Sequence, residues 1–136
     1  MTSPILALRQ AILAAAQADP DLAALMGGAA RLYDEPPRAA EPVYAVFGDV
    51  SAEDASTSSE RGHEQDLALV VWSREGSARS GLEAAERLAA ILDEAPLVLA
   101  GHRLANLRVT SIAADRDRDT GLARATLRLR AVTEVM

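Results

Sequence analysis

The chain has 136 residues, no cysteine and a net charge of −6, from 20 acidic residues against 14 basic ones, all of them arginine. This length fits a single domain spanning residues 1–136, and the lack of cysteine excludes disulfides and thiolate metal sites. An acidic chain with few aromatic residues disfavours nucleic-acid binding. There is no basic leader and no apolar run of about 20 residues, so we expect a cytosolic protein without a signal peptide or membrane span.

The N-terminal part of the chain predicts two helices. Ser3 can cap the first helix, Pro4 fits its first turn, and apolar residues follow at helical spacing. Asp19 and Pro20 repeat the same arrangement for a short second helix, which the two glycines at 27–28 should end.

Three strands are predicted next. Leu32 and Tyr33 suit a short strand, and residues 42–50 and 66–73 are rich in apolar, β-forming side chains. A polar connector, residues 48–65, lies between the last two and is longer than the ~4–6 residues of an ordinary loop. The sequence leaves two alternatives for it: a long hairpin whose ends extend the flanking strands, or a mobile binding loop.

A third helix and a hairpin complete the chain. The helix, residues 77–94, should bury an apolar stripe, while Glu83 and Arg87 on its solvent side fit an i, i+4 ion pair. Residues 103–114 and 122–132 should form the two arms of a hairpin around a turn rich in Asp and Gly.

This order of elements predicts an α+β fold: a mostly antiparallel or mixed sheet of about four to five strands, with two or three helices packed on one face. The last strand alternates, with alanine and leucine on one side and Arg124, Arg128 and Arg130 on the other. The other sheet face should therefore carry a row of arginines. Guanidinium groups repel one another unless acids oppose them, so this face is either a solvated surface with cross-strand acid partners or an interface.

No motif for catalysis or cofactor binding is apparent. His63 and His102 lie in polar stretches that predict exposure, and the neighbours His63 and Glu64 would point to opposite sides of a strand, so they cannot share a metal ion. The glycine pair lacks the spacing and the lysine of phosphate-binding loops. We therefore expect no catalytic residue, no metal and no cofactor, and we interpret Trp72 as a core residue.

Several blocks of the sequence together carry a family resemblance. They are RLYDEPP (31–37), the strand ending in FGD (47–49), TSSERGHEQDLALVVWS (57–73), LAGHRLANLR (99–108) and GLARATLRLRAVTE (121–134). In this order they resemble the small tail-completion proteins of long-tailed phages and gene transfer agents, which are grouped with tail terminators. The resemblance extends from the first helix to Glu134, and none of the blocks is a catalytic motif.

The resemblance implies a structural role without chemistry, in which hexameric rings of tail-terminator-like subunits cap the tail tube, end tube polymerisation and join the tail to the head. The implied partners are further copies of the chain, the major tail tube protein and a head or neck completion protein; DNA would pass through the ring without sequence-specific contact. Assembly would take place in the host bacterial cytoplasm, before the protein becomes part of a virion or gene transfer agent. The candidate contact residues are Glu60, Arg61, His63 and Glu64 in the connector, and Arg124, Arg128 and Arg130 on the last strand.

Two other functions stay open from the sequence. One is a head-completion protein, forming the neck or connector of the same particle. The other is a small hydrolase-like enzyme that uses His63 or His102. A gene for the major tail protein just downstream would favour the terminator, whereas loss of an activity on replacing either histidine, with assembly intact, would favour the enzyme.

Overall fold

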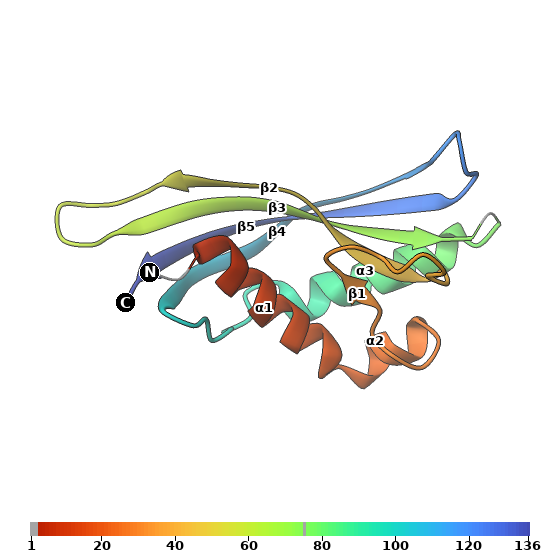
Figure 1. Ribbon diagram of the computed structural model, residues 1–136, viewed down its shortest axis with the longest axis horizontal. Coiled ribbons are helices and arrows are strands. Elements are labelled where there is room, and N and C mark those ends of the chain that lie inside the picture. The colour runs from red at the N-terminus through yellow and green to blue at the C-terminus, as the bar shows by residue number, and fades with distance from the viewer. Residues whose placement is uncertain (1–2, 75) are drawn as a thin grey trace.

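The computed structural model describes residues 3–74 and 76–136, which form one mixed sheet with all their helices on one face (Figure 1). The helices are α1 (Pro4–Gln17), α2 (Pro20–Leu25) and α3 (Ala78–Leu92), and the strands are β1 (Leu32–Tyr33), β2 (Tyr44–Asp54), β3 (Gly62–Ser73), β4 (His102–Arg116) and β5 (Ala123–Val135). The strand order is β1-β2-β3-β5-β4, with β1 parallel to β2 and the other pairs antiparallel. The predicted α+β fold is confirmed. None of the helices in the described ranges has the length and apolar character needed to cross a membrane.

Local capping explains where the first two helices begin and end. Ser3 Oγ caps α1, and Asp19 Oδ2 accepts a hydrogen bond from the Leu22 N–H at 2.9 Å at the start of α2. At the end of α2, the Gly28 N–H donates to the Ala23 carbonyl at 2.7 Å. Gly28 has φ +119°, a conformation that side-chain-bearing residues rarely adopt. Both predicted helices are therefore confirmed.

The core lies between the helices and one face of the sheet. In β5, alternate residues are buried, as the alternation in the sequence predicts, and α3 covers them with a stripe that includes Leu88 and Leu92, both 0% exposed. Complete burial of a leucine side chain stabilises the folded state by about 1.5–3 kcal/mol. The buried residues of β5 are Ala123, Ala125, Leu127, Leu129, Ala131 and Thr133.

Two side chains lie where the sequence did not predict them. Trp72 is only half-buried on the helix-free face, because it occupies an alternate position of β3 that points away from the helices. His102, predicted to be exposed, is 2% exposed. It begins β4 after a turn, where it forms a β-bridge with the buried Leu99.

The polar connector is an extended hairpin. β2 and β3 pair from Tyr44–Trp72 to Asp54–His63, and only residues 55–61 form the turn between them. Both strands are longer than predicted because backbone pairing does not require apolar side chains where the hairpin projects beyond the helices (Figure 1). Near the tip, β3 and β5 approach so closely that a Cβ atom on Gly62 would lie 2.9 Å from the Thr133 carbonyl oxygen.

One predicted ion pair is wrong, and its replacement joins two helices. Glu83 pairs with Arg79 at 2.9 Å, whereas Arg87 donates through Nε and Nη2 to both carboxylate oxygens of Asp19, at 2.8 and 2.6 Å. A guanidinium group binds a carboxylate best in this two-pronged geometry, which the i, i+4 partner does not offer here. The hydrogen bonds from Arg87 and the Leu22 N–H hold the pKa of the Asp19 carboxyl below its ordinary value of 3.8, against the effect of burial.

Replacing Asp19 with alanine should destabilise the protein in a pH-dependent way. We expect Asp19→Ala to lower the free energy of unfolding at pH 7 by about 1 kcal/mol or more, because α2 loses its cap and Arg87 loses its partner. Since the folded-state pKa is lowered, the carboxylate stabilises the fold above pH 3.8 and loses this effect as the pH falls through the folded-state pKa. Urea unfolding should therefore show a smaller difference from the wild type at lower pH.

The control for this prediction is Asp21→Ala. The Asp21 side chain is 73% exposed and lies 3.5 Å from Arg87 Nη2, so its loss should change stability little. Equal destabilisation by the two substitutions would contradict the role assigned to Asp19.

Replacing Gly62 with alanine should strain the hairpin where the tip joins β3. The added methyl group would meet the Thr133 backbone of β5, and overpacking of this kind costs about 1–3 kcal/mol. Ser59→Ala, at the exposed tip, should stay within about 0.5 kcal/mol of the wild type. Thermal unfolding of both variants measures the difference, and a Gly62→Ala protein as stable as the wild type would show that the two strands are less tightly packed.

Candidate functional site

The seven residues predicted to make contacts lie in two regions of the sheet. Residues 55–61, which we call the hairpin tip, carry Glu60 and Arg61, both exposed. His63 follows at the start of β3, half-buried, on the opposite side of the strand from Glu64, as predicted. The second region is the helix-free face of the sheet, which carries Glu64, Arg124, Arg128 and Arg130.

Arg124 is held from two sides on the helix-free face. Its Nε and Nη2 donate to the two carboxylate oxygens of Asp115 on β4, at 2.8 and 2.6 Å, and these bonds lower the pKa of Asp115. Its guanidinium carbon also lies 5.5 Å from the centre of the Trp72 ring, within the range of a cation–π contact. Trp72 is thus a platform for Arg124 and not the core residue that we expected.

The other two arginines of the row meet acids on the opposite side of β5. Arg130 Nη2 lies 2.5 Å from Glu64 Oε1 on β3, and Arg128 Nη1 lies 3.4 Å from Asp49 Oδ2 on β2. Asp49 occupies an irregularity in the pairing of β2 with β3, between Phe47 and Val50. Arg128 and Asp49 reach each other across β3, where Ala68 is the register partner of Arg128 and has a side chain too small to obstruct them.

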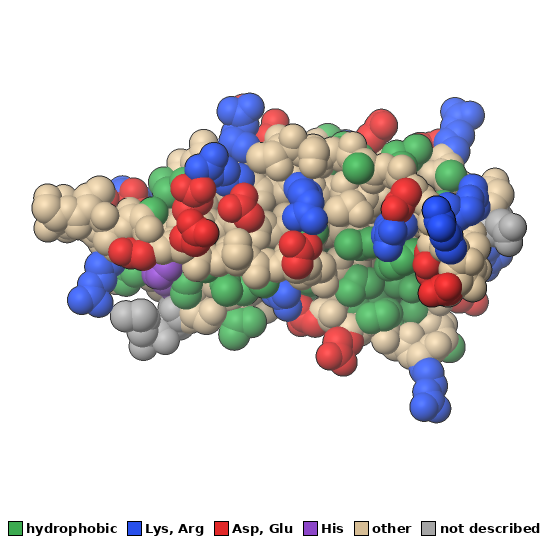
Figure 2. All heavy atoms as spheres, turned by 90° about the horizontal axis from the view of Figure 1, so that it is seen from above, with side chains coloured by type: hydrophobic (Ala, Val, Ile, Leu, Met, Phe, Trp, Pro, Cys, Tyr) green, Lys and Arg blue, Asp and Glu red, His purple; other side chains and the backbone are tan. Residues whose placement is uncertain are grey.

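The helix-free face is therefore a lattice of paired charges. Figure 2 shows acidic and basic side chains interspersed along this face. The acids remove the repulsion expected between the arginines, and they come from three different strands. Exposed ion pairs add little to stability, but they hold long side chains in defined positions. Such a face lacks the unbalanced positive charge with which proteins bind nucleic-acid phosphates.

Hydrogen bonds hold the hairpin tip in a defined conformation. The Thr57 N–H donates to the Glu60 carbonyl at 2.8 Å, and the Glu60 N–H donates back to Thr57 Oγ1 at 3.1 Å. The Arg61 carbonyl accepts a hydrogen bond from the Val135 N–H at 2.8 Å, which ties the tip to the end of β5. The tip is thus a structured part of the sheet and presents Glu60 and Arg61 at one end of the molecule.

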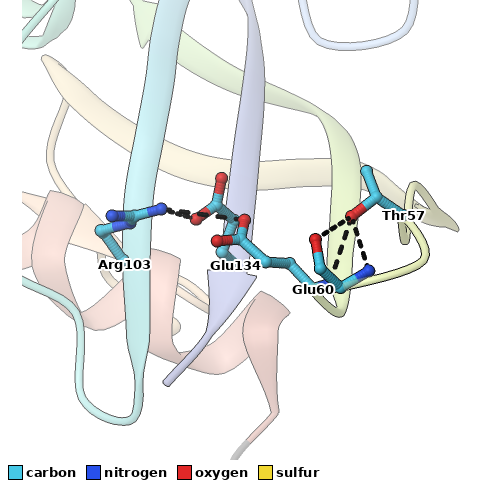
Figure 3. Close-up of polar contacts among 5 residues, drawn as sticks. Thr57, Glu60, Arg103 and Glu134 are labelled. Atoms are coloured by element: carbon cyan, nitrogen blue, oxygen red, sulfur yellow. Dashed lines mark hydrogen bonds and ion pairs between the residues drawn. The ribbon is translucent and has the colours of Figure 1, made fainter.

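Arg103, which the sequence analysis did not single out, links the tip to the rest of the sheet. Its guanidinium forms an ion pair with Glu134 and lies 3.9 Å from Glu60 Oε2 (Figure 3). An open hollow of about 540 Å³ lies beside it, lined by residues of the tip, by Arg103 and by the last residues of the chain. No local motif marks this arginine, because its partners are 31 and 43 positions away in the sequence.

The edge of the sheet at β4 is covered over part of its length. Asp93 Oδ1 accepts a hydrogen bond from the Val109 N–H at 2.9 Å, and the Glu94 N–H donates to the Leu107 carbonyl at 2.8 Å. Arg108 lies 3.5 Å from each of the two carboxylates. Among the described residues, the stretch 111–116 has no such cover, so this end of the edge is open to solvent or to a partner.

The described residues contain no group of three or more His, Asp or Glu side chains that could hold a metal ion. The two histidines are not brought together, since His63 is on β3 beside the tip and His102 is buried at the start of β4. What the arrangement can offer is a set of fixed charges, a projecting hairpin and a partly open sheet edge, all of which suit protein–protein contacts.

Comparison with known proteins identifies the family of the chain. The family model described as "Tail completion protein gp17" matches residues 10–134. A chain of a solved structure titled "Virion of native gene transfer agent (GTA) particle" has a TM-score of 0.88 and 29% sequence identity to this one, over 98% of this chain and 99% of that chain. A search of curated proteins gave no significant match. The family match runs from within α1 to nearly the end of β5, and the chain therefore belongs to the tail completion protein gp17 family.

Proposed function

We propose that this tail completion protein forms a ring that caps the tail tube, ends tube polymerisation and joins the tail to the head. One observation carries the proposal: the similarity to a chain from a gene transfer agent virion covers 98% of this chain at a TM-score of 0.88. The likeness therefore extends to the whole subunit, including the projecting hairpin, and not merely to a shared core. Residues 1–136 would act as one domain within the particle.

The shape of the subunit supports self-association. The β2–β3 hairpin extends beyond the helices at one end of the sheet, and the β4–β5 turn lies at the opposite end (Figure 1). A ring needs two different, complementary surfaces on each subunit, so that contacts repeated by rotation close on themselves. On this chain the hairpin tip and the helix-free face would be these two surfaces, and six copies is the number that the family resemblance implies.

The mechanism is complementary binding in which no bond is made or broken. One face of the ring would match the exposed end of the tube formed by the major tail protein. The other face would reject further tube subunits, so that growth stops, and would receive a head or neck completion protein. We place this assembly in the cytoplasm of the host bacterium. The contacts would be made by Glu60, Arg61, His63 and Glu64 beside the tip, and by Arg124, Arg128 and Arg130 on the helix-free face.

Particles assembled without this protein test the proposal. We expect electron micrographs to show tail tubes without length control, or full heads with no tails attached, because nothing caps the tube or bridges it to the head. Adding the purified protein back should restore joined particles. Joined particles of normal length in the deletion strain would end the terminator proposal.

The same experiment distinguishes the alternative function at the head. Heads without attached tails fit either function, so the length of the tubes decides. A head-completion protein would leave tubes of normal, uniform length that are capped but not joined. That outcome would assign the protein to the neck of the particle and not to the end of the tail tube.

Reversing one charge on the helix-free face should impair ring formation. Arg128→Glu would place an acid beside Asp49, while the fold should persist because the Arg128 side chain is 49% exposed. We expect an unchanged unfolding temperature but fewer rings and joined particles, counted by electron microscopy. Arg38→Glu, an equal charge change at an exposed loop position outside both contact regions, is the control. Normal assembly of the Arg128→Glu protein would assign the arginine row to a plain solvated surface.

A further inference from the structure

We propose that Arg103 is a positioning residue, which fixes the hairpin tip against the end of β5 and so sets the direction in which the tip meets a partner. The inference rests on the proposed function in one respect: it takes the tip to be a surface used in assembly. It assigns a role to a residue outside the seven predicted contacts, and the role is exerted through Glu60 and Glu134.

Arg103 lies opposite Glu134 in the sheet, close to the hairpin tip. Arg103 on β4 and Gly62 on β3 are both register partners of Glu134, which lies between them on β5. Because Gly62 has no side chain, nothing on β3 stands between Glu134 and the tip. The Arg103 guanidinium can therefore pair with Glu134 and still approach Glu60 at 3.9 Å (Figure 3).

Two carboxylates share the Arg103 guanidinium. Glu60 and Glu134 come from the tip and from β5, and both lie against the same guanidinium. Without a cation between them, the two carboxylates would repel each other and favour movement of the tip away from β5. Within the described residues, Arg103 forms an ion pair with each of these two acids.

A backbone hydrogen bond is a second link between the tip and β5. The hydrogen bond from the Val135 N–H to the Arg61 carbonyl, 2.8 Å long, joins the tip to β5 directly after Glu134. The bonds between Thr57 and Glu60 lie within the tip and would move with it. The hydrogen-exchange rate of the Val135 amide therefore shows whether the tip contacts β5, because this amide is protected from exchange only while that contact is made.

Amide hydrogen exchange of the purified subunit tests the first half of the proposal. Arg103→Glu brings three carboxylates together and should speed exchange at Val135 by roughly fivefold or more, while Leu127 in the middle of β5 stays unchanged. Arg108→Glu is the matched control: Arg108 is an exposed arginine on the same strand, but its acid partners are Asp93 and Glu94. It should leave Val135 at the wild-type rate.

A charge swap excludes a general loss of folding. Arg103→Glu combined with Glu134→Arg restores a cation between two acids and should return exchange at Val135 to within about twofold of the wild type. Unchanged exchange in the single Arg103→Glu variant would overturn the proposal. An increase that the swap does not reverse would also overturn it, because the effect would then not come from the charges.

Particle assembly tests the second half. Arg103→Glu should reduce the number of joined particles, and the swap should restore them. If Val135 exchange rises but assembly is normal, the direction of the tip has no role in assembly, and this inference fails while the ring proposal stands. If particles lacking the whole protein are normal, the ring proposal fails, and the exchange result still decides whether Arg103 docks the tip.

Discussion

The packing of α1 and α3 against a single face of the sheet is the interaction on which the rest of this structure depends. It buries alternate residues of β5 and β3 and leaves the intervening residues of both strands facing away from the helices. A strand with one face in the core must alternate in this way, since a shift by one residue would bring every arginine of β5 into the apolar interior. The charged face is therefore a direct consequence of the buried one.

The sheet extends past the helices at the β2–β3 hairpin (Figure 1), and this difference creates a surface suited to assembly. Where the sheet extends past the helices, neither face of the strands needs apolar side chains. There, local hydrogen bonds and ion pairs hold the chain in a defined conformation. At one end these contacts are the hydrogen bonds of the hairpin tip and the ion pairs of Arg103. Along β4, Asp93 and Glu94 cover part of an edge that could otherwise pair with any free strand.

Most of the correct sequence predictions concern local features, whereas the wrong partner of Arg87 and the wrong place of Trp72 concern long-range contacts. Helix caps such as Ser3 and Asp19 act within three residues, so their residue types reveal them. The partner of Arg87 is 68 positions away, and a helical spacing rule instead selected Glu83. Counting back from the β4–β5 turn would not have found the pairing of Arg103 with Glu134 either. The irregularities at Leu104–Asn106 and Val109–Ser111 shift the register, and residue types do not reveal them.

The sequence by itself determined the α+β class, the order of the elements, the two faces of β5 and, through its resemblance to tail-completion proteins, the family. These follow from short-range periodicity and from the order of blocks along the chain, which do not require knowledge of distant neighbours. Only the tertiary structure decided that the polar connector is an extended hairpin, that Trp72 supports Arg124 outside the core, and which acids neutralise the arginine row. Each of these depends on strand register, and register is set by the packing of the whole sheet against its helices.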